Sequence, residues 1–527
     1  MPRAMLPALV LMGCLLATHC AALRRHGAAP RGWNSYDGYG GAVSETQLLE
    51  TADYVAKYLK PFGYTVLTLD EGWSKKDGQI LTDEHGRPYP NLDMYPSTAE
   101  GRGMRPLSDA LRARGLELGL WMMRGVPRRA ATAFLPIANS SVRATAADAI
   151  RTDKNCFWSQ SCYGSNYPSQ PAAEYYASVA ALLRSWKVSY VKADCFFPNV
   201  PFPGPQPNGY FDEDIVGFGS AMRAANITIM FSPGISVTPR NASFLARHQY
   251  AVTYRVTEDM WDLWDGAQDG TFPTGIKQKL PVAERFHKFI GANGTFPDLD
   301  MLPFGTMMHA SKEKGVYGPA SPTRLTRDEQ VTAMTLWCIT RAPLIMGGRL
   351  PLEANDTFTL RLLTNPEVLY LQNSTRDARP LTALGAPGNA QYAWAAVPND
   401  CPDDTVGFCA MLALFNAGNS SADVLVPLEQ LRLANASASI EASEGGWEVA
   451  EPVAEPPTKL CARDLWARAP LNGVSAGTRF GRRLPPHGAA AYLLWRTDQA
   501  GCSSGADIFS FAPVLDEAPA NATRPAA

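Results

Sequence analysis

The 527-residue sequence carries almost no net charge and few histidines, and both shortages exclude classes of function. Its 48 Lys and Arg against 50 Asp and Glu give a formal net charge of −2, which offers no electrostatic basis for binding nucleic acid or an anionic membrane surface. Its seven histidines form no H-x-x-H or similar ligand pair, so a zinc site is not indicated. Oxygen-only magnesium or calcium sites stay open, although no stretch has a recognisable loop spacing for them.

Two further signatures are missing. No G-x-S-x-G elbow supports a Ser-His-Asp nucleophile, and His248, His287 and His309 are therefore interpreted as structural. No stretch after residue 22 is long and apolar enough to span a membrane.

The N-terminus has the pattern of a signal peptide, residues 1–22. Arg3 precedes the apolar run Leu6–Ala17, and small residues end near Ala21–Ala22. A short buried helix is the alternative. Nine N-x-S/T sequons follow, at Asn139, Asn226, Asn241, Asn293, Asn355, Asn373, Asn419, Asn435 and Asn521. Together these features predict a glycoprotein that is secreted or sent to a lysosome-like or vacuolar compartment.

The number of cysteines is consistent with a protein that enters an oxidising compartment and forms disulfides. Removal of residues 1–22 would leave eight of the ten, an even number. Cys156 and Cys162 are close enough in sequence for a disulfide to close a small loop, and so are Cys401 and Cys409. The sequence indicates no further pairing.

Residues 30–375 alternate short apolar strands with helical patterns. The strand candidates are Gly32–Tyr36, Tyr64–Leu69, Leu116–Met122, Val188–Asp194, Ile227–Ser232, Ala251–Val256, the region before Asp298, and Pro343–Gly347. Eight strands with intervening helices are the count of a (β/α)8 TIM barrel. A doubly wound sheet is the alternative, but no glycine-rich phosphate turn follows the first strand.

The sequence pattern changes after about residue 375, from alternating strands and helices to strand-like segments alone. Alternating segments such as Gln391–Val397, Met411–Asn416 and Ala489–Trp495 are separated by Gly, Pro, Asn and Asp turns. This pattern predicts an antiparallel β-sandwich over residues 385–497. Residues 498–527 are rich in Ala, Pro and Ser, and we expect them to be disordered.

The β-rich run VSYVKADC, Val188–Cys195, ends in a lysine and an aspartate. Side chains alternate along a strand, so Lys192 and Asp194 emerge on one face, one pleat apart. Lys192 is expected to hold Asp194 ionised near neutrality. From this stretch alone, Asp194 can be a nucleophile, a metal ligand or half of a structural ion pair.

The C-terminal ends of barrel strands line the active site. Here they carry Asp70 and Glu71, Trp121, Lys192 and Asp194, Ser232, Arg255 and Asp259, and Asp298 and Asp300. Acids can hold hydroxyl groups, while Trp33, Trp73 and Trp121 can cover the apolar face of a sugar ring. The mouth of the predicted barrel therefore indicates a sugar pocket.

Retaining glycoside hydrolysis needs one carboxylate as nucleophile and another as proton donor. Asp194 beside Lys192 suits the nucleophile. Asp259 follows Arg255 by four residues in a loop with Trp261 and Trp264, which could exclude water and favour an acid role. The alternative is that both acids form structural ion pairs with Lys192 and Arg255.

The chain resembles glycoside hydrolase family 27, the α-galactosidase / α-N-acetylgalactosaminidase (melibiase) family, across roughly residues 30–497. The matching motifs are GWNSYDGYG (Gly32–Gly40), LDEGW (Leu69–Trp73), YVKADC (Tyr190–Cys195), YRVTEDMWDLW (Tyr254–Trp264), PDLDMLPFG (Pro297–Gly305) and DEQVTAMTLWCITRAPLIMGG (Asp328–Gly348). LPPHGAAAYLLW (Leu484–Trp495) is similar to the closing strand of the family's C-terminal sandwich.

The resemblance implies roles for individual residues. Asp194 falls on the family's nucleophile and Asp259 on its acid/base. The positions implied to bind the sugar are Trp33, Tyr36, Asp70, Glu71, Trp121, Lys192, Ser232, Arg255 and Asp300. The family needs no metal or organic cofactor, and its products keep their anomeric configuration.

Two departures bear on the substrate. The family usually has GWNSW and an Asp-Asp pair, whereas this chain has Tyr36 and Asp70-Glu71. Glutamate is one methylene longer and could fill the space of the exocyclic hydroxymethyl group. A β-L-arabinopyranosyl residue has the ring geometry of galactose without that group, and glutamate here is a feature of family members that prefer it.

Three other segments depart from the family. FSPGISVTP (Phe231–Pro239) replaces a Cys-Glu-Trp run and leaves room for a bulkier 2-substituent. WMMRGVP (Trp121–Pro127) places Arg124 at the rim, either solvated or ion-paired or binding an acidic or extended glycan. Cys195 directly follows Asp194, where the family cysteine comes one residue later, so that disulfide is not carried over.

These observations predict a secreted retaining exo-glycosidase acting on terminal α-D-galactosyl-type residues. The alternatives are a β-L-arabinopyranosidase, an α-N-acetylgalactosaminidase, or a catalytically silent glycan-binding protein. The expected partner is a carbohydrate, with no nucleic acid or membrane partner, and a homodimer is an open expectation. The sandwich is expected to buttress the barrel.

Overall fold

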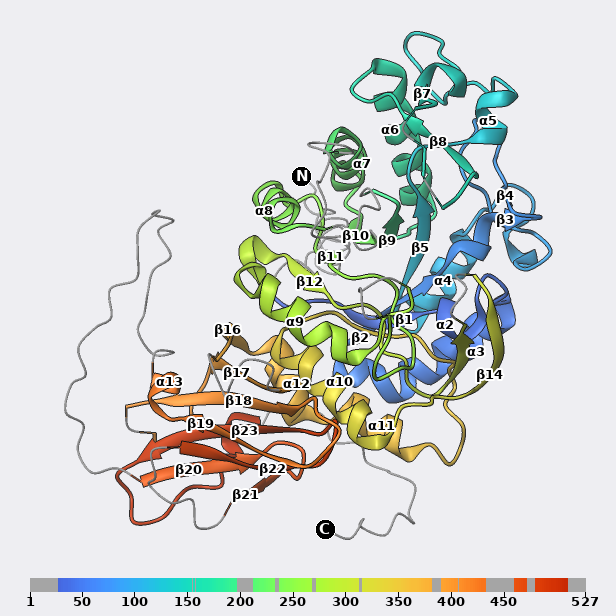
Figure 1. Cartoon of the computed structure of the whole chain (residues 1–527). Helices are drawn as coiled ribbons and strands as arrows, with labels where there is room; N and C mark the ends of the chain where they lie inside the picture. The colour runs from blue at the N-terminus through green and yellow to red at the C-terminus, as the bar shows by residue number, and fades with distance from the viewer. Residues whose placement is uncertain are drawn as a thin grey trace, which may run out of the picture.

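The computed structural model shows two packed parts (Figure 1). It describes residues 27–153, 155–156, 158–196, 212–232, 237–267, 272–311, 315–381, 390–405, 407–432, 459–471 and 479–509. The predicted signal peptide, residues 1–22, lies outside the described residues, and so does the predicted tail from residue 510 onward.

The first part is a barrel of eight parallel strands. They are β1 (Arg31–Asn34), β2 (Tyr64–Leu69), β5 (Glu117–Met123), β9 (Tyr190–Asp194), β10 (Thr228–Ser232), β11 (Thr253–Arg255), β12 (Phe296–Asp298) and β15 (Leu344–Met346). From β1 to β12 each strand pairs with the next in chain order, and β1 also pairs with β15. Leu302, just after β12, pairs with Met346 and closes the circle. The predicted (β/α)8 barrel is confirmed.

A helix lies in each connection between these strands. The helices are α2 (Tyr36–Tyr39), α3 (Glu45–Tyr54), α4 (Arg105–Ala113), α5 (Arg128–Thr132), α6 (Gln170–Ser185), α7 (Asp212–Ala224), α8 (Pro239–His248), α9 (Ile276–Phe286) and α10 (Arg327–Ile339), followed by α11 (Thr357–Thr364) and α12 (Pro366–Asn373). Helices α3, α6, α8 and α10 begin at the Ser or Thr caps Ser44, Ser169, Thr238 and Thr326. Each cap oxygen accepts a backbone N–H of the first turn, which fixes where the helix starts.

Three connections between barrel elements contain additional segments with short strands, which we call excursions. A hairpin of β3 (Lys75–Lys76) and β4 (Gln79–Ile80) follows β2. The β5–α6 excursion, residues 126–165, contains β6 (Val126–Pro127), α5, β7 (Ile150–Arg151) and β8 (Cys162–Ser165). A second hairpin, β13 (Thr306–Ala310) with β14 (Tyr317–Pro322), follows β12. All three leave from the C-terminal ends of barrel strands.

The second part is the predicted antiparallel sandwich. One sheet contains β16 (Thr375–Pro380), β17 (Gln391–Pro398), β18 (Cys409–Asn416), β23 (Ala489–Thr497), β20 (Lys459–Asp464) and β21 (Ala469–Pro470), in that order. The other pairs β19 (Ala422–Pro427) with β22 (Arg479–Leu484), and a short helix, α13 (Glu429–Arg432), follows β19.

Both faces of the larger sheet are buried, against different partners. On β18, Ala410, Leu412 and Leu414 pack with Val424 and Val426 of the smaller sheet. The alternate residues, Met411, Ala413 and Phe415, belong to the core shared with the barrel. The period of two therefore places one set of side chains inside the sandwich and the other against the barrel.

Buried polar contacts join the two parts. Arg463 of β20 donates to both oxygens of Glu367 on α12, at 2.9 and 2.7 Å. Thr332 Oγ1 donates to the carbonyl of His487 at 2.6 Å, and Trp466 Nε1 donates to Thr335 Oγ1 at 3.0 Å. The sandwich thus braces α10 and α12 of the barrel.

Residues 498–509, assigned from the sequence to a disordered tail, are packed. Cys502 forms a disulfide with Cys461, and Ser503 bonds Asp404 through its backbone N–H and its hydroxyl. Phe509 packs edge-on against Tyr370, with ring centroids 5.2 Å apart. Apolar and disulfide contacts therefore hold this segment in spite of its polar composition.

The disulfide predictions are right in one case and wrong in the other. Cys401 pairs with Cys409, as predicted. Cys156 pairs with Cys195, directly after the end of β9, and not with Cys162. Cys162 is a free buried thiol on β8. Proximity in sequence misled here because Cys156 lies beside Cys195, just after the end of β9, in spite of a separation of 39 residues.

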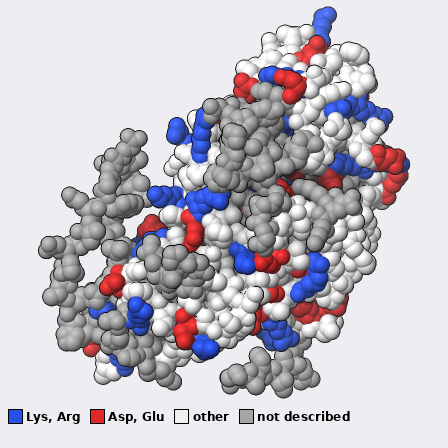
Figure 2. Space-filling view, viewed as in Figure 1, with Lys and Arg blue, Asp and Glu red and all other residues white. Residues whose placement is uncertain are grey.

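Charge is mixed on the one face of the molecule that can be seen in Figure 2. On the face drawn in Figure 2, basic and acidic side chains are interspersed and do not gather into one large patch. Among the described residues, no helix has both the length and the apolar character that a membrane span requires.

Candidate active site

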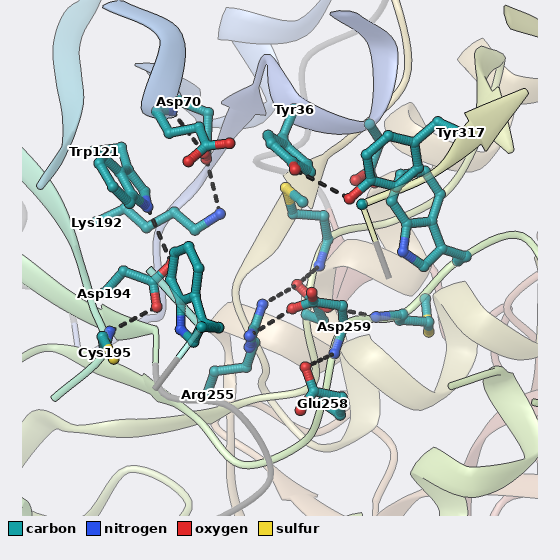
Figure 3. A pocket seen from close by; sticks show the side chains of 18 residues that line it. Tyr36, Asp70, Trp121, Lys192, Asp194, Cys195, Arg255, Glu258, Asp259 and Tyr317 are labelled. Carbon is teal, nitrogen blue, oxygen red and sulfur yellow. Dashed lines mark hydrogen bonds and ion pairs between the residues drawn. The ribbon is translucent and has the colours of Figure 1, made fainter. Parts of the chain in front are cut away.

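A pocket of about 260 Å³ opens at the C-terminal ends of the barrel strands (Figure 3). Nine of the eleven residues predicted from the sequence line it: Tyr36, Asp70, Glu71, Trp121, Lys192, Asp194, Arg255, Asp259 and Asp300. They come from β1, β2, β5, β9, β11 and β12 or from the residues that follow these strands.

Trp33 and Ser232, the other two predicted residues, do not line this pocket. Trp33 is fully buried in the core, where its Nε1 donates to the carbonyl of Gly348 at 2.8 Å. Ser232 is fully buried at the end of β10. Residues 233–236, which follow it, lie outside the described residues. The strand ends were located correctly, but these two side chains are enclosed by protein.

Asp194 is held by two N–H donors. Trp121 Nε1 donates to Oδ2 at 3.0 Å, and the backbone N–H of Cys195 donates to Oδ1 at 2.7 Å. Desolvation in the barrel mouth raises the pKa of Asp194 to about 6, against the opposing attraction of the Arg255 and Lys192 cations. Asp194 therefore stays mostly ionised at neutral pH while losing much of its hydration.

Lys192 forms its ion pair with Asp70, not with Asp194. Its Nζ lies 2.8 Å from Asp70 Oδ2, which also accepts a hydrogen bond from Asn34 Nδ2 at 2.8 Å. Asp70 Oδ1 accepts the backbone N–H of Glu71 at 2.8 Å. The direct partner of Lys192 is thus a carboxylate that follows β2, and Lys192 lowers the pKa of Asp194 only through its positive charge, in the direction expected from the sequence.

Arg255 joins the second group of acids. Its Nη2 lies 2.7 Å from Asp259 Oδ1, and its Nη1 lies 3.4 Å from Asp300 Oδ1. Asp300 Oδ2 accepts the backbone N–H of Met260 at 2.7 Å. The buried guanidinium and Asp300 therefore fix the loop on which Asp259 stands.

A buried lysine holds the same loop from the side of α9. Lys279 Nζ donates to Thr257 Oγ1 at 2.8 Å, to Thr274 Oγ1 at 2.6 Å and to the carbonyl of Glu258 at 3.2 Å. Thr274 N donates to the carbonyl of Asp259 at 2.9 Å. Burial lowers the pKa of Lys279 to about 7, and it forms no ion pair with the described acids.

Asp37 is a pocket residue that the sequence reasoning missed. It lies in the motif GWNSYDGYG but is 1% exposed, and its Oδ2 has no hydrogen-bond partner among the described residues. Burial and the neighbouring Asp300 raise its pKa well above the usual range. Asp37 therefore adds to the pocket wall a carboxyl group whose charged form is disfavoured by burial.

Tyr317 was also missed, because the β13–β14 hairpin gave no signal in the sequence. Tyr317 of β14 shares a hydrogen bond with Tyr36, with 3.0 Å between the hydroxyl oxygens, and stacks on Trp261 at 4.8 Å between centroids. Asp262 anchors the hairpin through His309 Nδ1 at 2.8 Å and Arg324 Nη2 at 2.7 Å. The hairpin thus forms one wall of the pocket.

Arg124 and Trp264 contact other parts of the fold and do not line the pocket. Arg124 is 2% exposed, pairs with Asp214 at 2.7 Å and donates to the carbonyl of Cys195 at 2.7 Å. The sharper expectation, that it binds an acidic glycan at the rim, is therefore wrong. Trp264 stacks on His487 of the sandwich, with ring centroids 4.1 Å apart, and does not line the pocket.

Two residues of the site have unusual backbone angles. Cys195 has φ of 62° and Asp300 has φ of 89°, and both are non-glycine residues. Such conformations cost about 1–3 kcal/mol each and persist where surrounding contacts impose them. The disulfide at Cys195 and the backbone hydrogen bonds to Asp300 supply those contacts.

The chemistry available is that of carboxyl groups. No cluster of three or more His, Cys, Asp or Glu suited to a metal ion is found in the described part of the chain. The pocket instead places a partly desolvated carboxylate, Asp194, across from a second acid, Asp259, with Arg255 between them and with Trp121, Tyr36 and Lys192 in the surrounding wall (Figure 3). This arrangement can support nucleophilic attack and proton transfer on one bound sugar.

No model of a known protein family matches the chain. The two curated relatives described next are both named as alpha-galactosidases. Alpha-galactosidase 2 of Arabidopsis thaliana is 23% identical over 341 residues, which cover 64% of this chain and 65% of the relative, just under two thirds of its length. A probable alpha-galactosidase of Dictyostelium discoideum is 22% identical over 469 residues, covering 89% of this chain and 92% of the relative.

Solved structures also match most of the chain. A family 27 β-L-arabinopyranosidase from Geobacillus stearothermophilus is 29% identical, with a TM-score of 0.74, covering 92% of this chain and 99% of that one. A putative alpha-N-acetylgalactosaminidase from Bacillus halodurans is 28% identical, with a TM-score of 0.68, covering 89% and 97%.

Replacing Asp194 by Asn should change the stability of the fold by an amount that depends on pH. The native pKa of about 6 lies above the ordinary value of 3.8, so the native carboxyl binds more protons than the unfolded one, and wild type loses stability as pH rises between these values. The variant lacks this loss, although its amide nitrogen cannot accept one of the two N–H donors, which costs the same at every pH. Relative to wild type, the variant should therefore gain about 2 kcal/mol between pH 4.5 and pH 7.5. Thermal unfolding at the two pH values measures it; an equal difference from wild type at both would contradict the assignment.

Proposed function

The chain belongs to glycoside hydrolase family 27, and we propose that it is a retaining exo-glycosidase that removes terminal α-D-galactosyl-type residues from glycans or glycoconjugates. The observation that carries this proposal is the pairing of Asp194 and Asp259 in one pocket. The pocket volume of about 260 Å³ lies below the range of about 300–1,000 Å³ that suits drug-sized ligands, as expected for a single sugar ring.

The proposed reaction has two displacements. An oxygen of Asp194 attacks the anomeric carbon while Asp259 protonates the leaving oxygen, and a covalent glycosyl-aspartate forms. Asp259, now ionised, then takes a proton from water as that water attacks the anomeric carbon and releases Asp194. The two inversions together retain the anomeric configuration.

The surrounding groups suit an oxocarbenium-like transition state. Trp121 and the Cys195 N–H orient Asp194 without neutralising it. Asp70, Lys192, Asp300 and Arg255 are buried and fixed by one another, and we propose that they hold the sugar hydroxyls. Because these groups are already in place, little reorganisation is needed when charge develops on the sugar.

Substitution of each acid should separate the two roles. Asp194→Asn should abolish turnover of every substrate while sparing sugar binding. Asp259→Asn should slow hydrolysis of an alkyl α-galactoside by about 10²–10⁴, but that of a dinitrophenyl α-galactoside far less, because an activated phenolate needs no proton. Steady-state kinetics with both substrates measures this. Undiminished turnover by Asp194→Asn would show that the nucleophile is elsewhere.

A second candidate activity is β-L-arabinopyranoside hydrolysis. Glu71 lies in the pocket wall with Tyr36, and Lys75 forms an ion pair with its Oε2. Lys75 also lies over the Trp121 ring, 5.0 Å from its centroid. The longer acid is thus held at the side of the pocket where we place the hydroxymethyl group of galactose. The similarity to the Geobacillus arabinopyranosidase also favours this candidate.

Glu71→Asp should shift selectivity toward galactosides. Shortening the acid by one methylene should open space for the hydroxymethyl group and raise the galactoside to arabinopyranoside ratio of kcat/KM about tenfold, the effect of one methylene group in a pocket. Aryl α-D-galactopyranoside, β-L-arabinopyranoside and N-acetyl-α-D-galactosaminide form the panel. Glu71→Gln, which keeps the length and removes the charge, is the control. An unchanged ratio would remove the case for the second candidate.

Lys279→Met should impair acid catalysis selectively. The variant leaves the carbonyl of Glu258 and two threonine hydroxyls without the donor that fixes the Asp259 loop. We expect about a tenfold loss in kcat on the alkyl galactoside, the equivalent of about one hydrogen bond, and a smaller loss on the dinitrophenyl galactoside. Lys277→Met, on the same helix and ion-paired with Asp265 at 2.7 Å, is the control. Equal losses on both substrates would indicate a general structural role.

We also propose a secretory or lysosome/vacuole-type route with N-glycosylation. Of the sequon asparagines that the structure describes, Asn139, Asn226, Asn293, Asn355, Asn373 and Asn419 are exposed. Asn241 is partly buried and caps α8. Loss of mass on endoglycosidase treatment of the secreted protein would support this route, and an unmodified chain would contradict it. The homodimer stays a prediction.

A further inference from the structure

A second, wider pocket adjoins the sugar pocket. Its volume is about 850 Å³, and the two pockets share Glu71 and Trp158 on their walls. The β3–β4 hairpin forms one side through Lys75, and the β5–α6 excursion forms the other through Arg128 and Arg129. A molecule that leaves the sugar pocket past Trp158 therefore enters this second pocket directly.

The second pocket has an exposed aromatic surface where the two pockets meet. Trp158 is 39% exposed, and it lines both pockets. A single exposed apolar side chain is common on a protein surface, so its position at the junction of the two pockets is what points to a ligand. The flat face of an indole matches the apolar face of a pyranose ring, and the indole N–H adds a donor.

The cations of this pocket are not equally available. Arg128 lies over the ring of Tyr163, 4.5 Å from its centroid, and bonds Gln160. Lys75 is paired with Glu71. Arg129 is exposed and pairs with no acid within the described ranges. It therefore offers a guanidinium with free N–H donors, and Asp77 and Gln160 add acceptor oxygens to the same wall.

We propose that this second pocket binds the leaving-group side of an oligosaccharide, with the sugar next to the cleaved bond stacked on Trp158 and a following sugar hydrogen-bonded by Arg129. This assignment rests on the proposed function, because it takes the sugar pocket as the site of cleavage. Under this assignment, the natural substrate is an extended glycan and not a small aryl or alkyl glycoside.

The test compares a short and a long substrate with the same terminal sugar. An aryl glycoside reaches as far as Trp158, whereas a linear trisaccharide also enters the second pocket. Wild type should have the higher kcat/KM on the trisaccharide once the intrinsic reactivity of the leaving group is corrected for. Arg129→Ala should lower kcat/KM on the trisaccharide about tenfold or more, as expected for loss of hydrogen bonds to a charged donor, and leave the aryl glycoside within about twofold.

Two controls make the outcome specific. Arg143→Ala removes an exposed arginine of the same excursion that lines neither pocket, and both substrates should be unaffected. Trp158→Ala should reduce turnover of both substrates, and of the trisaccharide more, because its ring borders both pockets. Equal effects of Arg129→Ala on the two substrates would overturn the inference while leaving the proposed function standing. Wild type inactive on both substrates would overturn the proposed function itself.

Discussion

Two buried cations, Lys192 and Arg255, form ion pairs with acids at the barrel mouth, and the site depends on this balance of positive and negative charge. Lys192 pairs with Asp70 at 2.8 Å, and Arg255 pairs with Asp259 at 2.7 Å and with Asp300 at 3.4 Å. The two cations offset the mutual repulsion of carboxyl groups that lie close together in one desolvated pocket. Asp194 stands apart, because among the described residues it receives N–H donors and no direct ion pair. The proposed attack by Asp194 on a carbon atom would therefore not require a salt bridge to break first.

Contacts beyond the barrel strands fix the loops on which these charged residues stand. The disulfide Cys156–Cys195 ties the residue after Asp194 to the β5–α6 excursion. Lys279 and Thr274 hold the backbone of the Asp259 loop. The sandwich braces the barrel behind it, through the buried contact of Arg463 with Glu367. Each support acts within a few ångströms of a reacting group or of the strands beneath it, which is how a loop site reaches the precision that catalysis needs.

Much of this was predictable from the sequence, because strand period and motif order locate the barrel strand ends. Asp194 and Lys192 were placed correctly on one face of β9, yet the partner of Lys192 comes from β2, 122 residues away. Contacts between strands cannot be read from one strand alone. Trp33 and Ser232 show the converse limit, since a motif residue can be enclosed by the core. Tyr317 and the disulfide of Cys195 depend on excursions that have no periodic pattern.

The central claim is a double displacement through Asp194, and the anomeric configuration of the first product tests it most directly. Proton NMR spectra recorded during the first minutes of hydrolysis of an α-galactoside, or of a β-arabinopyranoside if that sugar is preferred, distinguish the two anomers before they equilibrate. The account predicts that the first-formed sugar has the configuration of the substrate. A first-formed sugar of the opposite configuration would mean direct attack by water and would contradict the assignment of Asp194 as nucleophile.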